Sequence, residues 1–114
     1  MVSGFRIFEI ITIGNDLFCW VAVDNEIVAH IFIYVIHKIP MPHRMNASWG
    51  RVATVRTIPA YRNQGVGSAL MEHVKTWSRA LDLQELIVYP SEQSISFYER
   101  AGFTNNNEVF ELQV

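Results

Sequence analysis

The hydrophobic periodicity of this 114-residue chain changes at Gly65, and that change restricts the fold more than any other feature. Before Gly65, β-branched and aromatic residues form four strand-like runs that are separated by polar turns or by prolines. After Gly65, apolar residues recur every three or four positions, as they do on one face of an α-helix. A chain that carries both patterns must pack helices against a sheet, so the sequence predicts an α/β fold.

The four strand-like runs cover residues 5–13, 17–23, 27–36 and 49–57. Polar triplets separate the first three runs, which indicates two consecutive hairpins. In the fourth run, strict alternation predicts that Val55 and Thr57 lie on the same side of the sheet as Arg51 and Ala53. The first half of the chain is therefore predicted to consist of strands.

The second half is predicted to alternate between helices and strands. The stripe that predicts a helix ending near Ala80 consists of Val66, Leu70, Val74, Trp77 and Leu81. A short strand at 85–89 follows, then a second helix at 90–100 with Gly102 as its cap, and a hairpin at 103–114. The order β-β-β-β-α-β-α-β-β predicts a mixed, mostly antiparallel central sheet with flanking helices.

Length and charge restrict the class of protein. A chain of 114 residues is long enough for one core, so we expect a single domain over 1–114. Half of the residues are apolar and 18% are charged, as in compact globular proteins. The net charge is −2 and the pI is near 6, so the chain lacks the basic field that phosphate backbones require. We therefore expect no nucleic-acid partner.

The sequence also predicts a cytoplasmic protein. Cys19 is the single cysteine, which excludes an internal disulfide and fits a reducing compartment. The first residues show no cationic segment followed by an apolar run and a cleavage site, so we expect no signal peptide. The most apolar stretch, 27–36, is too short to span a bilayer, and we expect no membrane association.

The junction "IPAYRNQGVGSALMEHV" (58–74) has the composition of an anion site. A helix N-terminus offers unpaired N–H groups and a partial positive charge, and Gly65 and Gly67 let a ligand approach them. Arg62 and Ser68 add a cation and a hydroxyl donor, which suits a pyrophosphate. The alternative is a strand-to-helix turn in which the glycines only relieve strain. The stretch matches neither the dinucleotide-binding motif nor the P-loop.

Two segments resemble signatures of the GNAT acetyltransferases. "TIPAYRNQGVGSAL" is similar to the family's acetyl-CoA-binding motif, with Arg62, Gly65 and Gly67 in its R-x-x-G-x-G positions. "YPSEQSISFYERAGF" (89–103) is similar to the second signature, a helix that ends in a tyrosine followed by a glycine-phenylalanine pair. The resemblance runs from about Val21 to the C-terminus, and the two motifs occur in the family's order.

The resemblance implies that acetyl-CoA serves as a co-substrate and lies between the fourth and fifth strands. It also implies a direct attack by a primary amine on the thioester, with Tyr98 as the general acid for the leaving thiolate. The alternative is that Tyr98 only packs and bonds the cofactor sulfur. The cofactor-binding residues implied in this way are Val55, Arg56 and Thr57 for pantetheine, Arg62, Asn63, Gln64, Gly65, Val66, Gly67 and Ser68 for pyrophosphate, and Ser91.

The sequence departs from the family pattern at three places. Ser91 stands where many members have asparagine, and we expect it chiefly to cap the second helix. The fourth strand-like run has no carboxylate for a general base, which leaves Glu26, Glu85 and His37, or an amine that arrives already deprotonated. The histidines at 30, 37, 43 and 73 show no metal-ligand spacing, so we expect no metal.

The third departure concerns the acceptor side. About sixteen residues precede Leu17 and read as strand, whereas the family has two helices there, so we expect these N-terminal helices to be shortened or absent. The acceptor site is then open on that side, or a second subunit closes it in a homodimer. The sequence thus predicts an acetyl-CoA-dependent N-acetyltransferase for a small or peptide amine. The alternative is a non-catalytic CoA-binding or assembly module.

Overall fold

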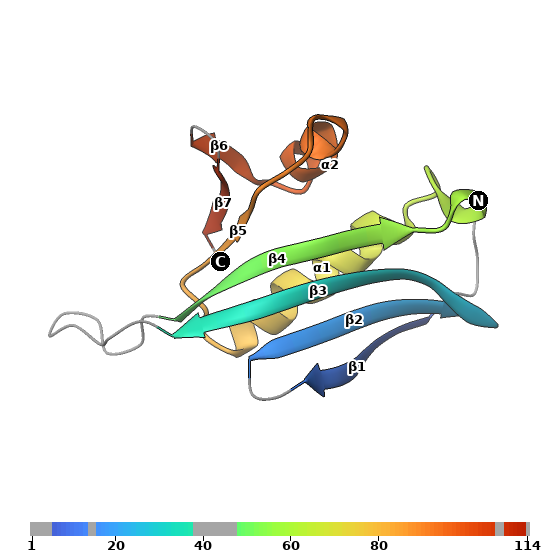
Figure 1. Ribbon diagram of the computed structural model, residues 1–114, viewed down its shortest axis with the longest axis horizontal. Coiled ribbons are helices and arrows are strands. Elements are labelled where there is room, and N and C mark those ends of the chain that lie inside the picture. Colours follow the sequence, from blue (N-terminus) through green and yellow to red (C-terminus); the bar gives the residue numbers. More distant parts are fainter. Residues whose placement is uncertain (1–5, 14–15, 38–47, 107–108, 114) are drawn as a thin grey trace, which may run out of the picture.

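The computed structural model describes residues 6–13, 16–37, 48–106 and 109–113, and they form a layered arrangement of one sheet and two helices (Figure 1). The strands are β1 (Arg6–Ile13), β2 (Leu17–Asp24), β3 (Glu26–His37), β4 (Ser48–Thr57), β5 (Glu85–Val88), β6 (Thr104–Asn106) and β7 (Val109–Gln113). The helices are α1 (Val66–Ala80) and α2 (Ile95–Arg100), and the 3₁₀ turns are η1 (Pro59–Tyr61) and η2 (Glu92–Ser94). The predicted element order is confirmed.

The seven strands form a single mixed sheet in the order β1-β2-β3-β4-β5-β7-β6. All neighbours pair antiparallel except β4 and β5, which run parallel with α1 as the connection between them. The C-terminal hairpin places β7 between β5 and β6. The predicted fold class, a mixed and mostly antiparallel sheet with flanking helices, is therefore confirmed.

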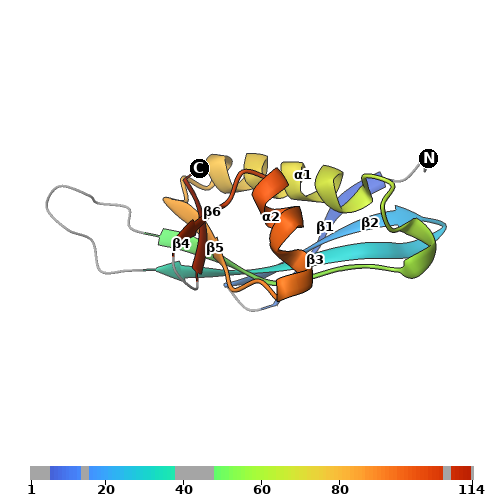
Figure 2. The ribbon, with the colours of Figure 1, turned by 90° about the horizontal axis from the view of Figure 1, so that it is seen from above.

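Helix α1 covers one face of the sheet, as Figure 2 shows from above. Its buried apolar residues, Val66, Leu70, Met71 and Val74, pack with the strand residues that face them, among them Ile31 and Ile33 of β3. The predicted stripe fails only at Leu81, which follows the last helical residue and is 44% exposed. Ser78 is buried instead, and its hydroxyl donates to the Val74 carbonyl at 2.8 Å.

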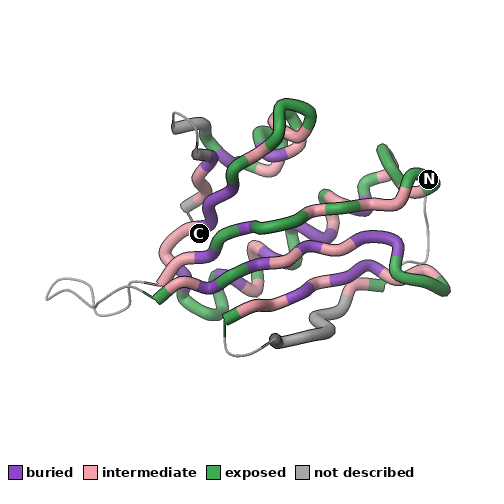
Figure 3. The backbone as a smooth tube through the Cα atoms, in the orientation of Figure 1, coloured by how far each residue is buried: buried purple, intermediate pink, exposed green. Residues whose placement is uncertain are grey.

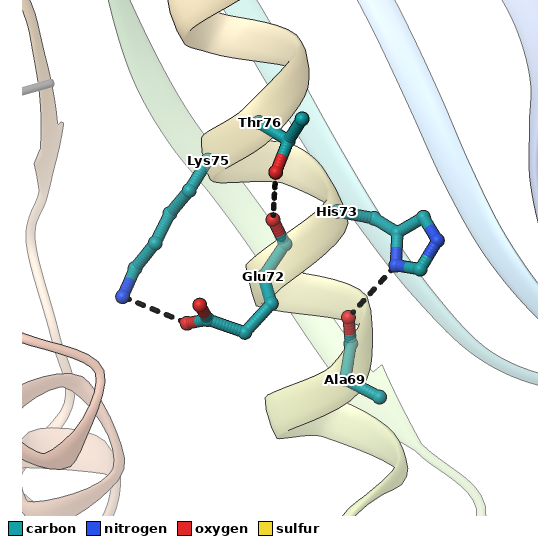
Figure 4. Close-up of polar contacts among 5 residues, drawn as sticks. All are labelled: Ala69, Glu72, His73, Lys75 and Thr76. Atoms are coloured by element: carbon teal, nitrogen blue, oxygen red, sulfur yellow. Dashed lines mark hydrogen bonds and ion pairs between the residues drawn. The ribbon is translucent and has the colours of Figure 1, made fainter.

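The opposite side of α1 carries polar side chains that contact one another and the carbonyls of the helix (Figure 4). Lys75 and Glu72 form an ion pair at 2.8 Å, and the Thr76 hydroxyl donates to the Glu72 carbonyl at 3.1 Å. His73 contacts the Ala69 carbonyl through Nδ1 at 3.2 Å. Neither of the two helices among the described residues is long and apolar enough to cross a membrane.

The other face of β2, β3 and β4 carries no helix in the described part of the chain (Figures 2 and 3). We call it the outer face. Its exposed residues include Tyr34 of β3 and Arg51, Thr54 and Arg56 of β4. Strands are the only regular elements that the structure describes before η1.

The second helix is shorter than predicted. The chain stays extended at Ser91, makes the 3₁₀ turn η2, and becomes α-helical only at Ile95. The predicted cap at Gly102 is confirmed, because its φ is +101° and its N–H donates to the Glu99 carbonyl at 3.0 Å. The Phe103 N–H donates to the Tyr98 carbonyl at 3.0 Å, which completes a Schellman motif.

A stability prediction follows from Gly50, which lies buried in β4 beside β5. A Cβ at this position would stand 2.7 Å from Leu86 Cδ2 and 3.3 Å from side-chain atoms of both Ile33 and Leu83. Leu86 and Ile33 are fully buried and have little room to move, so we expect Gly50→Ala to lower the free energy of unfolding by about 1–3 kcal/mol. Urea denaturation measures this. The exposed control Arg56→Lys should change it by less than about 0.5 kcal/mol.

Candidate functional site

The sheet opens between β4 and β5 (Figure 1). The two strands pair only from Gly50 to Val52 on β4, whereas β4 continues against β3 as far as Thr57. The β4 backbone at 53–57 therefore has no β5 partner on its second edge. This is the opening in which the resemblance placed the cofactor.

A bulge in β4 lies at the start of this opening. The register with β3 shifts between Val52 and Thr54, which leaves Ala53 without a partner residue. The prediction that Val55 and Thr57 share a side with Arg51 and Ala53 was therefore wrong. Val55 packs against the core, whereas Arg51 and Ala53 are exposed, because the extra residue reverses the alternation.

Two adjoining cavities occupy this region. The loop cavity, about 580 Å³, lies at the start of α1, and the cleft cavity, about 460 Å³, lies in the opening. The loop cavity is lined by Thr57, Tyr61, Arg62, Asn63, Gly65, Val66, Gly67, Ser68, Gln93, Ser96, Phe97 and Arg100. The cleft cavity is lined by Ala53, Thr54, Val55, Thr57, Arg62, Gly67, Val88, Tyr89, Pro90, Ser91, Gln93, Ser94, Phe97 and Tyr98. Because five residues line both cavities, one elongated ligand can occupy them together.

The loop cavity has the properties of an anion site. Gly65 precedes α1 with φ of +83°, and the first bond of the helix runs from the Ala69 N–H to its carbonyl at 3.0 Å. The N–H groups of Val66, Gly67 and Ser68 thus lack helical acceptors at the end where the macrodipole is positive. These three residues line the cavity together with two arginines, and no carboxylate does.

The loop before α1 is held by its own side chains. The Arg62 Nε donates to the Thr57 carbonyl at 3.0 Å, and the Gln64 amide donates to the Ala60 carbonyl at 2.9 Å. The Tyr61 hydroxyl donates to the Asp24 carboxylate at 2.8 Å, which ties the loop to the end of β2. These contacts fix the loop that carries Gly65 and Gly67 without the need for a bound ligand.

Gly67 serves helix packing as well as ligand approach. A Cβ here would stand 3.3 Å from Phe97 Cε1 and 3.7 Å from the Thr57 hydroxyl. Gly65, in contrast, faces open space, since no atom lies within 4 Å of the equivalent position. The two glycines of the motif thus have different physical roles.

Tyr98 is a buried residue that lines the cleft cavity. The side chain is 5% exposed, and its ring packs edge-on against Phe97 and Phe103, with centroids 5.1 and 5.4 Å away. Burial raises its pKa to about 12. The phenol therefore stays protonated at neutral pH and can donate a proton.

Not all of the other predicted site residues line one of the two cavities. Arg56 and Gln64 line neither cavity, although the Arg56 backbone lies on the open edge of β4. Ser91 lines the cleft cavity, but it does not cap α2 as predicted, because α2 begins four residues later. Its hydroxyl lies 3.1 Å from the Ser94 hydroxyl and makes no capping bond to η2.

Sequence reasoning missed the contribution of α2 to the loop cavity. Gln93 of η2 lines it, as do Ser96, Phe97 and Arg100 of α2, of which Arg100 adds a second cation. Their spacing of three and four residues places them on one helical face, and this signal could have identified them.

The expected alternatives for a general base lie elsewhere. His37 pairs with Ser48 and Asp16 at 2.8 and 3.3 Å, at the start of β4. Five residues of extended strand, roughly 17 Å, separate Ser48 from the bulge at Ala53. Glu26 lies at the start of β3 and Glu85 at the start of β5. Among the described residues, no carboxylate or imidazole lines the loop or cleft cavity.

The chain is similar in sequence to known proteins. The model of the acetyltransferase (GNAT) family matches residues 3–103. A glucosamine 6-phosphate N-acetyltransferase of Trypanosoma brucei brucei is 32% identical over 65 residues, which are 57% of this chain and 44% of that protein. The match thus spans less than half the length of this curated relative.

Solved structures share the fold. NAA60 of Arabidopsis thaliana in complex with acetyl-CoA has a TM-score of 0.78 at 15% identity, over 89% of this chain and 78% of that chain. Glucosamine-6-phosphate N-acetyltransferase of the same plant has a TM-score of 0.72 at 18% identity, over 89% and 66%. A Trypanosoma brucei acetyltransferase has a TM-score of 0.71 at 26% identity, over 81% and 65%. From the family match over most of its length and the shared fold, we conclude that this chain belongs to the GNAT acetyltransferase family.

Proposed function

We propose that the protein transfers the acetyl group of acetyl-CoA to a primary amine. The observation that carries this proposal is the continuity of the two cavities, which lead from an anion site at α1 to Tyr98 in the opening between β4 and β5. The family match and the names of the relatives support acetyl transfer as the chemistry.

The residues present fit two parts of acetyl-CoA, the pyrophosphate and the pantetheine arm. The N–H groups of Val66, Gly67 and Ser68, with Arg62, would hold the pyrophosphate. The edge of β4 at 55–57, which has no β5 partner, offers main-chain groups to the pantetheine arm, whose amides can pair with them like an added strand. The thioester end would then lie in the cleft cavity.

Acetyl-CoA, when bound, supplies a thioester whose carbonyl carbon forms a bond with the amine nitrogen while the bond to sulfur breaks. Tyr98 donates its hydroxyl proton to the departing sulfur and is reprotonated from the solvent, which takes up the proton that the amine releases. A pKa near 12 keeps Tyr98 in the protonated form that this role requires.

A second candidate is a non-catalytic module that binds CoA. The lack of a carboxylate or imidazole among the described residues that line the loop and cleft cavities favours it, because no base is at hand to deprotonate an ammonium group. An enzyme with this site instead requires an amine that is deprotonated in solution. An α-amino group, with a pKa near 8, meets this condition far better than a lysine side chain.

Release of the CoA thiol from acetyl-CoA tests the proposed activity. The amines form two matched pairs, glucosamine 6-phosphate with glucosamine and glycyl-glutamate amide with glycyl-glutamine amide. The fifth is a peptide whose only amine is a lysine ε-amine. We expect amine-dependent release with the first four, and at pH 7 a rate at least about a hundredfold lower with the lysine peptide, because little of it is deprotonated. Binding of acetyl-CoA without any release would support the non-catalytic module.

Arg100 provides a test of how the cofactor is held. The 3′-phosphate of CoA carries up to two negative charges in addition to the pyrophosphate, and Arg100 is the second cation of the loop cavity. We expect Arg100→Gln to weaken acetyl-CoA binding about tenfold and to leave binding of 3′-dephospho-CoA unchanged. Isothermal titration calorimetry measures both, with Arg79→Gln as the control. An equal loss of affinity for the two ligands would contradict the assignment of Arg100 to the 3′-phosphate.

A further inference from the structure

We propose that a third cavity binds the acceptor amine, and that Arg51 selects acceptors that carry an anionic group. This inference rests on the proposed function. The outer-face cavity, about 580 Å³, is named for Tyr34, Arg51 and Thr54, exposed residues of the outer face that line it. It is lined by Asp16, Tyr34, Val35, Ile36, Arg51, Ala53 and Thr54.

The outer-face cavity adjoins the cleft cavity at the β4 bulge. Ala53 and Thr54 line both cavities, and the bulge leaves Ala53 exposed rather than packed against α1. A ligand in the outer-face cavity therefore reaches the opening from the side opposite to the glycine loop. An amine placed at Ala53 and Thr54 would border the cleft cavity, which Tyr98 also lines.

Arg51 gives the outer-face cavity its cationic character. Its guanidinium lies over the Tyr89 ring, with the central carbon 5.7 Å from the ring centroid, and it forms no ion pair with a described carboxylate. Stacking holds the planar group and leaves its N–H donors available for a carboxylate or phosphate. Arg51 precedes Ala53 by two residues, or roughly 6–7 Å of strand, so the anionic group would lie several bonds from the reacting amine.

The negative charge that lines the outer-face cavity lies far from the bulge at Ala53. Asp16 is the single carboxylate among the lining residues, and it pairs with His37 at 3.3 Å. It adjoins the start of β2, two strands away from β4 and so roughly 10 Å from it. Beside Ala53 the field of Arg51 thus dominates, and it disfavours a cationic amine that has no anionic group.

A binding experiment tests the proposal without relying on turnover. The protein saturated with CoA, which carries no acetyl group, is titrated by nuclear magnetic resonance with glucosamine 6-phosphate, glucosamine, and the C-terminal amides of glycyl-glutamate and glycyl-glutamine, so that only one member of each pair carries an anionic group. For at least one matched pair, we expect the anionic member to bind wild type about tenfold more tightly. The preference should disappear in Arg51→Gln, persist in part in Arg51→Lys, and be unchanged in Arg79→Gln on the far side of the sheet.

The outcomes separate this inference from the proposed function. Equal affinities within both pairs, no binding by either anionic member at 10 mM, or a preference that survives in Arg51→Gln would overturn the role of Arg51. A failure of CoA itself to stabilise the protein would instead contradict the proposed function. In that case the same titrations of the unliganded protein still decide the role of Arg51.

Discussion

Acetyl-CoA at about one hundred times its dissociation constant should stabilise the wild-type protein by about 2.7 kcal/mol, and Gly65→Trp should abolish this effect. In a domain of this size each kcal/mol moves the midpoint by about 4–8 °C, so the expected shift is roughly 10–20 °C. The reason lies in the position of Gly65. Its missing Cβ faces open space in the loop cavity, so an indole there would occupy the volume proposed for the pyrophosphate.

The control for this experiment must separate blocking of the site from backbone strain. Gly65 has a φ of +83°, a conformation that costs most other residues about 1–2 kcal/mol. Asparagine is among the residues that best tolerate a positive φ. Gly65→Asn therefore introduces the same kind of backbone strain as Gly65→Trp, but with a much smaller side chain. We expect Gly65→Asn to melt slightly lower than wild type and to keep most of the shift with acetyl-CoA. A full shift in Gly65→Trp would show that the glycine loop only turns the chain.

The parts of the fold that the sequence predicts well have strong local causes. Helix α1 ends at the predicted Ala80, because its apolar positions follow one period for four turns and Gly65 marks its start. The cap at Gly102 is equally local, since the positive φ of a Schellman motif favours glycine. The start of α2 has no comparable signal. Serine is a favoured cap, but Ser91 precedes the 3₁₀ turn η2 rather than α2, and its side chain makes no capping bond there.

The features that shape the candidate site depend on distant partners. The bulge at Ala53 exists because β4 carries one residue more than β3 in their pairing, and no pattern within β4 reveals that count. Arg100 reaches the loop cavity only because α2 packs beside the start of α1, where Phe97 meets Gly67. Sequence reasoning therefore located the glycine loop but not the second cation, nor the side to which Val55 points.

Tyr98→Phe should reduce kcat about 10²- to 10⁴-fold while the dissociation constant of acetyl-CoA stays within about twofold of wild type. The variant keeps the ring that packs against Phe97 and Phe103, so the cavity and the fold should persist. Steady-state kinetics with the best amine of the panel and calorimetry with acetyl-CoA measure the two quantities. An unchanged kcat would mean that Tyr98 only packs, as in the alternative assignment.

The pH dependence of stability provides an independent check on the state of this phenol. Burial raises its pKa to about 12, whereas in the unfolded chain the pKa is about 10. Between pH 10 and 12 the unfolded state loses this proton and the folded state retains it, so ionisation of Tyr98 lowers the free energy of unfolding as pH rises. Urea denaturation at pH 9 and pH 11 should therefore show a smaller loss for Tyr98→Phe than for wild type. If both proteins lose stability equally, Tyr98 is not the buried, protonated donor that the proposed proton transfer requires.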